Sequence, residues 1–212
     1  MSEEPKESKD NTTIIVAIIG AVAAVAVALI SLMNGRFTPP PTNQPPLIID
    51  PLESTFGWTT YADGGSSTIQ ISSVTGKAGN GIEASYNLEQ GRWVGIFREI
   101  NPGLLVGTDA ISFSYKGSGA PNTIELKLLV KTDESHSAVF SVLRSHASNV
   151  RGWTTLEASY PEFVCWTDTG CNAGDKIDLS KVWKIDIAIS NKTGDTAGTG
   201  SVIFDDIQAI PH

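Results

Sequence analysis

The sequence has few of the residues that catalytic and metal centres use most often. Among its 212 residues there are three histidines and two cysteines. It lacks a Gly-x-Ser-x-Gly elbow, a His-Glu-x-x-His pair and a glycine-rich phosphate loop leading into a helix. Jelly-roll glycosidases need two carboxylates that face each other across a cleft, often spaced on one strand as Glu-x-Asp-x-x-Glu. The sequence lacks this spacing as well. Its strand glutamates are instead scattered (Glu83, Glu99, Glu125 and Glu157). We therefore expect no enzymatic activity.

Excess positive charge is missing as well. From residue 48 onward the chain carries nineteen acidic and twelve basic residues, a net charge of −7. Such a surface repels a phosphate backbone, so we expect no nucleic-acid partner. The chain also shows no internal repeat, no heptad pattern and no clear amphipathic helix.

One segment stands apart from the rest of the chain. The twenty residues from Ile14 to Met33 contain no charge and are apolar on every side. At ~1.5 Å per residue they span about 30 Å, the thickness of a bilayer's hydrocarbon core. A buried core helix would show polar residues at a 3.6-residue period, and a cleaved signal peptide usually has a shorter apolar stretch of ~7–15 residues. The sequence therefore favours a transmembrane helix over residues 13–33.

The segments on either side of this run suggest how the chain is arranged. Residues 1–12 form a polar tail, and residues 34–46 form a linker with five prolines between Pro39 and Pro46. Prolines in this density favour an extended spacer. Two lysines precede the apolar run and only Arg36 follows closely, which favours a cytoplasmic N-terminus. We therefore expect a single-pass protein of the cell membrane whose domain, residues 47–212, is extracytoplasmic.

The two cysteines lie close together in the segment CWTDTGC. Five residues separate Cys165 from Cys171 in a loop-like stretch, which favours a small disulfide clip. Two unpaired thiols are the alternative. A disulfide would agree with an oxidising compartment outside the cell.

From about Leu47 onward, apolar residues recur at every second position. The segments TIELKLLV, AISFSYKG and KIDIAIS each place their apolar side chains on one face, which is typical of half-buried strands. Further strands are expected at 67–75, 81–88, 92–100, 137–144, 153–159 and 201–210, with glycine-rich turns between them. The pattern predicts an all-β sandwich.

Three stretches resemble the galactose-binding-like β-jelly-roll domains, which include many carbohydrate-binding modules. They are LIIDPLESTFGWTTYADGG, GNGIEASYNLEQGRWVGIFREI and KIDLSKVWKIDIAISNKTGDTAGTGSVIFDDIQAI, and together they reach from residue 47 to residue 210. The chain departs from the family pattern at Pro51 and Leu52, where an acid and a phenylalanine are usual, and in its cysteine pair. The resemblance implies a jelly roll that binds an oligo- or polysaccharide.

The resemblance also implies a structural calcium ion between the first and last strands. By motif, its ligands would be Glu53 and Asp205, with Asp206 as the alternative. Calcium takes six to eight oxygen ligands, which carboxylates and backbone carbonyls from two chain ends can supply. The competing interpretation is that the two aspartates form a solvated edge or a turn cap.

A saccharide site needs aromatic rings for the apolar face of the sugar and polar groups for its hydroxyls. Of the five tryptophans, Trp58, Trp153 and Trp183 occupy positions that favour the core, whereas Trp166 lies in the cysteine loop and Trp93 can face either side of its strand. The predicted ligand-binding residues are Trp166, Trp93, Tyr86, Arg92 and Arg98.

The sequence thus favours a surface-displayed, non-catalytic carbohydrate-binding module. A structural or adhesive protein that makes protein contacts through the sandwich is the main alternative, because one fold hosts both roles. A glycan-active enzyme is a more distant one. Asn191 begins an N-x-T sequon in a predicted exposed loop, so we also expect it to accept a glycan where the host glycosylates this compartment.

Overall fold

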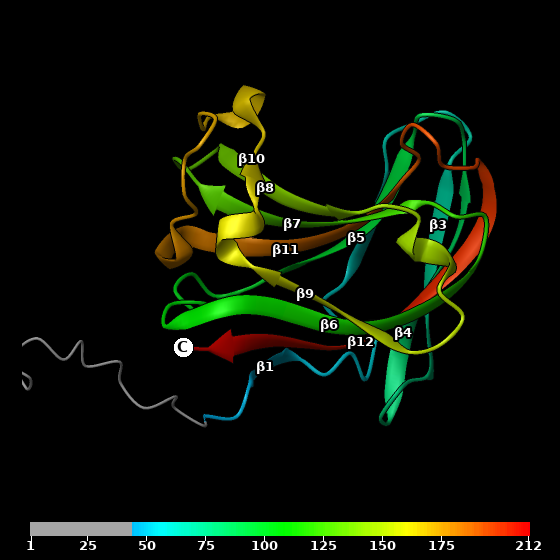
Figure 1. Cartoon of the computed structure of the whole chain (residues 1–212), viewed down its shortest axis with the longest axis horizontal. Coiled ribbons are helices and arrows are strands. Elements are labelled where there is room, and N and C mark those ends of the chain that lie inside the picture. Colours follow the sequence, from blue (N-terminus) through cyan, green and yellow to red (C-terminus); the bar gives the residue numbers. More distant parts are fainter. Residues whose placement is uncertain (1–43) are drawn as a thin grey trace, which may run out of the picture. The chain divides into compact units, whose positions relative to one another are not determined.

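The computed structural model describes residues 44–212, which fold into two antiparallel sheets packed face to face (Figure 1). The predicted membrane segment, residues 13–33, lies outside this range together with the polar tail and most of the linker. Among the residues that are described, no helix is long and apolar enough to cross a membrane. The prediction of an all-β sandwich is confirmed.

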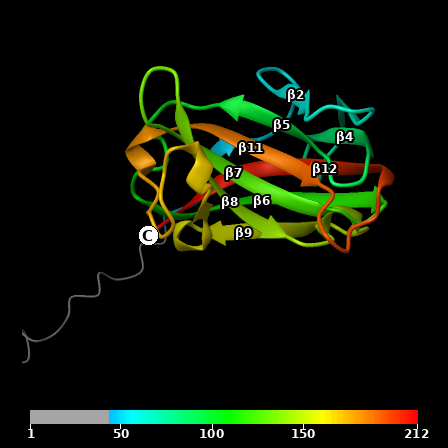
Figure 2. The ribbon, with the colours of Figure 1, turned by 90° about the horizontal axis from the view of Figure 1, so that it is seen from above.

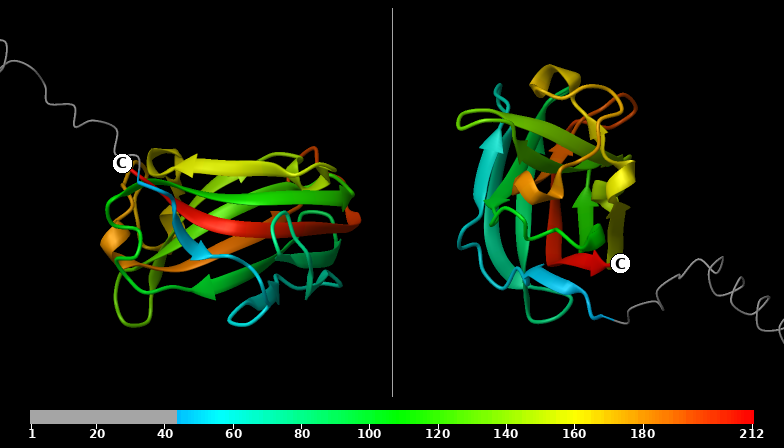
Figure 3. Two further views of the ribbon diagram at one scale, coloured as in Figure 1. Left: turned by 90° about the horizontal axis from the view of Figure 1, so that it is seen from below. Right: turned by 90° about the vertical axis from the view of Figure 1, so that its left-hand side faces the viewer.

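Six strands form the first sheet, which we call sheet A. In spatial order they are β3 (Thr68–Thr75), β4 (Asn80–Leu88), β12 (Gly198–Pro211), β6 (Thr108–Gly119) and β9 (Thr154–Ser159), with β1 (Leu47–Asp50) pairing with β12. Leu47 pairs with Ala209, so the start of the domain lies beside the C-terminus (Figure 3). The first and last strands of the domain therefore meet in one sheet.

Six more strands form sheet B, which lies over sheet A in Figure 2. In spatial order they are β10 (Val164–Cys165), β8 (Ser137–Arg144), β7 (Thr123–Lys131), β11 (Val182–Ser190), β5 (Trp93–Glu99) and β2 (Thr59–Ala62). Short 3₁₀ turns η1 (Ala147–Asn149), η2 (Tyr160–Glu162), η3 (Thr167–Thr169) and η4 (Leu179–Lys181) interrupt the connections. The sequence did not predict β1, β2 or β10 as strands, because segments of two to four residues are too short to show an alternation.

The apolar side chains that recur at every second position fill the space between the sheets. On β11 the alternate residues Ile185, Ile187 and Ile189 are fully buried and belong to one continuous core. Sheet A contributes Phe113 and Phe204, whose rings lie edge to face with centroids 5.7 Å apart. Burying one such side chain stabilises the fold by roughly 1.5–3 kcal/mol, so the inward alternation specifies the sandwich.

A β-bulge near the end of β12 changes which residues point inward. Phe204 is buried before the bulge and Ile207 after it, so the inward positions shift from even to odd numbers. Asp206 lies at the bulge with a φ of 53°, an unusual value for a residue other than glycine. The bulge brings Asp205 to a fully buried position, where a carboxylate needs partners.

Candidate functional site

Aromatic and charged side chains gather on the outer face of sheet B, which we call the aromatic face. Its members alternate with core residues: on β5 Val94 and Ile96 are buried, so Trp93 and Phe97 point outward. The register places Phe97 beside Asp186 of β11, Asp186 beside Lys127 of β7, and Lys127 beside Ser141 of β8. A row of functional groups therefore crosses four neighbouring strands.

Tyr61 of β2 lies across this row because its neighbour has no side chain. Tyr61 pairs with Gly95, and a Cβ atom on Gly95 would come within 2.5–2.6 Å of the Tyr61 ring and hydroxyl. The ring can therefore reach over β5, where its hydroxyl donates a hydrogen bond of 2.8 Å to Oδ1 of Asp186 on β11. Gly95 thus permits the contact that joins β2 to the centre of the face.

Trp166 covers the other side of the row and is held by the cysteine loop. The structure confirms the Cys165–Cys171 disulfide, whose Cα atoms are 6.1 Å apart. Trp166 directly follows Cys165, and its indole Nε1 donates to Oγ of Ser141 at 2.8 Å. The ammonium of Lys127 lies 5.0 Å from the Trp166 ring centroid, a cation–π contact. Tyr61 and Trp166 therefore flank Lys127 and Asp186.

Three charged side chains are nearly buried at the centre of the aromatic face. Lys127 Nζ lies 3.7 Å from Oε2 of Glu125 and 3.3 Å from the Tyr61 hydroxyl. Glu125 also accepts a hydrogen bond from Ser190 at 3.1 Å. Buried charges need such partners, and these pairs leave the groups fixed in position. A set of fixed donors and acceptors between two rings can bind a ligand rich in hydroxyl groups.

Burial changes the ionisation of this cluster. Loss of hydration raises the pKa of Asp186 from 3.8 to about 6, while the charge of Lys127 and the hydrogen bond from Tyr61 act in the opposite direction. Burial, and then the negative charge of Asp186, raise the pKa of Tyr61 above its ordinary value. Tyr61 therefore remains a neutral hydrogen-bond donor, and Asp186 changes charge near pH 6.

Both of the predicted ligand-binding tryptophans lie on this face. Trp93 is 38% exposed, and Trp166 is partly buried. Arg92 lies at the rim, in the turn before β5, with its guanidinium 3.5 Å from Asp63. Trp93 and Trp166 thus lie on the same outer face of sheet B, and whether they bind a ligand stays a prediction.

The structure does not bring Tyr86 and Arg98 to this face. Tyr86 points into the core from β4, and its hydroxyl donates to Oγ of Ser148 at 3.1 Å. Arg98 takes an inward position on β5 and forms an ion pair with the buried Asp50, which also accepts from Trp58 Nε1 at 3.0 Å. The position of each residue in the alternation of its strand decides whether its side chain points inward or outward, and a shift of one residue would reverse that direction.

Trp183 differs from its predicted place in the core. A register irregularity between Val182 and Lys184 breaks the alternation, and Trp183 is only partly buried. Its Nε1 donates to Ser137 at 2.8 Å, and the Lys184 ammonium lies 4.2 Å from its ring centroid. Trp183 therefore extends the aromatic face toward the start of β11.

Sequence reasoning missed Tyr61, Lys127 and Asp186 as site residues. A signal was present, because Lys127 and Asp186 interrupt apolar strands at the positions opposite to their core residues. That signal shows which residues leave the core but not which of them meet. Their meeting depends on strand order, since β7 and β11 are neighbours although about fifty residues separate them.

The predicted calcium ligands lie near one another around the loop before β4. Asp205 Oδ2 accepts from the backbone N–H groups of Lys77 and Ala78 at 2.6 and 3.0 Å, and Glu53 Oε2 accepts from Asn80 N at 2.9 Å. Asp205 Oδ1 is buried without a hydrogen-bond partner in the described chain. Burial, Asp205 and Glu53 raise the pKa of Asp206.

These carboxylates fit a cation only in part. Within residues 44–212, no three side chains of histidine, cysteine, aspartate or glutamate are arranged as a metal site. Backbone N–H groups already satisfy one oxygen of Glu53 and one of Asp205. The orphaned Oδ1 of Asp205 is the remaining feature that a hard cation would satisfy.

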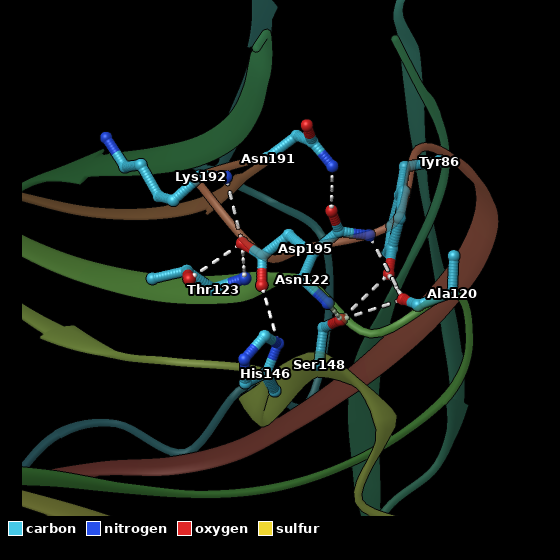
Figure 4. Close-up of polar contacts among 9 residues, drawn as sticks. All are labelled: Tyr86, Ala120, Asn122, Thr123, His146, Ser148, Asn191, Lys192 and Asp195. Carbon is cyan, nitrogen blue, oxygen red and sulfur yellow. Dashed lines mark hydrogen bonds and ion pairs between the residues drawn. The ribbon is translucent and has the colours of Figure 1, made fainter. Parts of the chain in front are cut away.

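A buried polar network closes the loop between β11 and β12 (Figure 4). Asp195 Oδ2 accepts from the backbone and hydroxyl of Thr123 and from the backbone of Lys192, and Asp195 Oδ1 lies 2.8 Å from His146 Nδ1. Asn191 is 3% exposed, and its Nδ2 donates to Oδ1 of Asn122 at 2.9 Å. The expected glycosylation of Asn191 is therefore wrong for the folded chain, because the amide nitrogen is buried and already bonded.

Comparisons with known proteins agree with this architecture. No curated protein matches the chain. Among solved structures, the chain is similar to the family 11 carbohydrate-binding module of a cellulosomal cellulase of Clostridium thermocellum, with 21% identity, a TM-score of 0.66, and coverage of 79% of this chain and 95% of that one. A structure of a Clostridium thermocellum family 11 module in complex with a β-1,3-1,4-mixed-linked tetrasaccharide gives 22% identity and a TM-score of 0.67, over 78% and 95% of the two chains.

The sequence itself carries the family assignment. Residues 38–211, most of the chain, match the family described as carbohydrate binding domain (family 11). The resemblance to jelly-roll carbohydrate-binding modules is thereby confirmed. The chain belongs to family 11 of the carbohydrate-binding modules, whose members bind sugar without catalysing its cleavage.

Proposed function

We propose that the aromatic face is the surface through which this chain binds an oligo- or polysaccharide. The arrangement of Tyr61 and Trp166 around Lys127 and Asp186 is the observation that carries the proposal. A pyranose has an apolar C–H face that packs on aromatic rings, and hydroxyl groups that pair with carboxylate and ammonium groups. Because the solved family 11 complex contains a β-1,3-1,4-mixed-linked tetrasaccharide, a β-glucan with these mixed linkages is the first probe to use.

Affinity electrophoresis of the full chain in gels containing mixed-linked β-glucan tests this proposal. We expect retardation of the wild-type chain and a loss of at least about tenfold in affinity for Tyr61→Ala and for Trp166→Ala, since central aromatic contacts often contribute ~2 kcal/mol or more. Trp153→Ala is the matched control. Trp153 is also a partly buried tryptophan, but it lies against Lys116 of sheet A and not on the aromatic face of sheet B. Equal retardation of all four proteins would refute the assignment of this face.

Protein contact remains the main alternative use of the sandwich. Val164 and Leu143 are 63% and 44% exposed beside Ser141, so the β8–β10 side of sheet B does offer apolar surface. The centre of the face favours a sugar, because it carries fixed charged groups rather than a continuous apolar patch. Failure of the chain to bind any of a panel of glycans at millimolar concentration would favour the alternative.

We further propose that the module is displayed on the outside of the cell membrane by residues 13–33. The uncharged run of twenty residues and the proline-rich linker support this proposal, and so does the disulfide, which persists in oxidising compartments. Fractionation of cells that produce the full chain, followed by protease treatment of intact cells, tests it. A chain found in the soluble fraction, or protected from external protease, would contradict the display.

Finally, we propose that calcium binds between Glu53, Asp205 and Asp206 as a structural ion. The orphaned Oδ1 of Asp205 and the raised pKa of Asp206 support it, because a cation would relieve both. Chelation should then lower the melting temperature of the wild-type chain and restoring calcium should reverse the change. Asp205→Asn should remove the response, and an unchanged wild-type melting temperature on chelation would count against the ion.

A further inference from the structure

A second polar surface lies on the opposite sheet from the aromatic face. At the end of β6, a hollow of about 490 Å³ opens on the outer side of sheet A. We call it the Lys116 hollow. Besides two glycines it is lined by Lys116, Ser118, Asn149, Arg151, Ser201 and Ile203. Its volume lies within the range of ~300–1,000 Å³ that is typical of small-molecule sites.

The hollow exists because a loop replaces a strand along this edge of β6. Pairing of β6 with β9 ends at Tyr115, and beyond it Gly117 N donates to the backbone oxygen of Val150 at 2.6 Å. A Cβ atom on Gly117 would come within 2.2 Å of the Ser148 carbonyl oxygen. The missing side chain therefore lets the loop approach β6, and the loop brings Arg151 close to Lys116.

The charge of the hollow is opposite to that of the rest of the domain. From residue 48 onward the chain has a net charge of −7, yet the charged residues that line the hollow are the bases Lys116 and Arg151. Neither base forms an ion pair with an acid in residues 44–212, and Lys116 instead lies 4.8 Å from the Trp153 ring centroid. In register, Glu83 pairs with Ile203 one strand beyond Lys116, and Asp205, which is fully buried, pairs with Ser114 two positions before Lys116. Two unpaired cations in one hollow are complementary to an anion.

The neutral groups of the hollow suit a sugar better than a bare inorganic ion. Ser118 and Ser201 place their hydroxyl oxygens 3.4 Å apart, and Asn149 adds an amide. Ile203 offers apolar surface for the C–H groups of a ring. We propose that the Lys116 hollow binds an acidic saccharide unit, one that carries a carboxylate or a sulfate ester. This site uses no residue of the aromatic face, so it does not depend on the proposed glucan binding there.

Calorimetric titration of the full chain with trigalacturonate, a sulfated galactotriose and neutral galactotriose tests this inference. We expect the hollow to bind an acidic trisaccharide, and the comparison between trigalacturonate and the sulfated sugar shows which acidic group it accepts. Binding should weaken with added salt, since screening reduces the attraction between exposed charges. It should fall by about tenfold or more in the double variant Lys116→Gln, Arg151→Gln, because hydrogen bonds to charged groups are the stronger ones.

Lys176→Gln is the control for removal of a positive charge, because Lys176 is exposed in the loop before η4. Both Lys116 and Arg151 are on the surface, so the double variant should keep the wild-type melting temperature and its behaviour in β-glucan gels. Equal binding of neutral and acidic trisaccharides, or full binding by the double variant, would overturn the inference. Inorganic sulfate that binds as tightly as the sulfated sugar would overturn it too, by showing a general anion site.

Discussion

The outer faces of the two sheets differ although both sheets follow the same alternation. Sheet A presents mainly small hydroxyl and amide side chains outward, such as Ser85 and Asn87 on β4 and Thr199 and Ser201 on β12. Sheet B presents rings and charges, with Tyr61 and Trp166 around Asp186. The inward residues of both sheets are interchangeable in chemistry, since both supply apolar side chains to one core.

The inward residues build the fold, whereas the outward residues make its two surfaces different. Packing requires only that inward residues be apolar and of fitting volume. Outward residues are free of that requirement, so their chemistry reflects what each face contacts. On sheet B the outward row is continuous across strands, whereas on sheet A the charged pair Lys116 and Arg151 is confined to one end. Substitutions on each side of this division should therefore affect different measurements.

The largest expected effect is on stability, from an inward residue. Phe113→Ala should lower the free energy of unfolding by about 3–5 kcal/mol, because it leaves a cavity beside Phe204 in the fully buried core. Its matched outward control is Ser85→Ala on β4, where we expect a change within about 0.5 kcal/mol. Urea unfolding followed by fluorescence measures both. Similar losses for the two variants would contradict the division between inward and outward residues.

Gly95→Ala should act on ligand binding rather than on stability. The new methyl group would occupy the space of the Tyr61 ring, which can rotate away but then loses its hydrogen bond to Asp186. We expect β-glucan affinity to fall by about tenfold or more with little change in melting temperature. Gly152→Ala is the control, because a Cβ atom there meets nothing within 4 Å. Unchanged affinity in Gly95→Ala would show that the position of Tyr61 does not matter.

Removal of the disulfide should affect both measurements at once. In the double variant Cys165→Ser, Cys171→Ser, the small closed loop is lost, and we expect about 2 kcal/mol less stability from the chain-entropy estimate. Because Trp166 lies within that loop, β-glucan affinity should fall as well. Thermal unfolding and affinity electrophoresis under non-reducing conditions measure the two effects. A double variant that keeps full affinity would show that Ser141 and Lys127 alone hold Trp166.

The smallest effect is a pH dependence that differs in sign between stability and binding. The folded-state pKa of Asp186, about 6, lies above its ordinary value of 3.8, so its contribution to stability is fully present below about pH 4 and is lost as the pH rises through 6. Binding of sugar hydroxyls to the ionised carboxylate should instead strengthen over the same range. The difference between the wild-type chain and Asp186→Asn, measured from pH 4 to 7, isolates this group.

In that comparison, Asp186→Asn should remove the rise in β-glucan affinity through pH 6. It should also make the stability profile flatter than that of the wild type between pH 4 and 6. A rise in affinity that persists in the variant would assign the pH dependence to another group of the aromatic face.

Much of the fold was predictable because alternation is a local property. Ile185, Ile187 and Ile189 are spaced so that only a strand places them on one side, and the structure confirms them in the core. The disulfide was predictable for a similar reason, since six positions of separation allow the two cysteines to meet within one loop. The alternation failed where a bulge interrupts it, as at Trp183, because the period then shifts by one residue.

The site was predictable only in part. Trp166 was assigned outside the core because a short cysteine loop has little room to bury a ring, and it does lie on an outer face. Tyr86 was misplaced although it alternates with Ile82, Ala84 and Leu88 on β4, which puts it on the core face; its hydroxyl is bonded inside the sandwich. Tyr61 was missed because its role depends on Gly95 and Asp186, which are 34 and 125 positions away in the chain.

The sequence by itself determined the all-β class, the inward residues of most strands, the cysteine clip and the family, because these depend on spacing and on motifs within short segments. The tertiary structure alone decided which outward residues meet. It placed Asp186 between Phe97 and Lys127 through the order β5-β11-β7, and it brought Arg151 beside Lys116 through a loop docked on β6. The strand order brings together segments that are distant in the chain. The physical reason for this arrangement is burial, because each sheet covers its apolar face by packing against the apolar face of the other sheet.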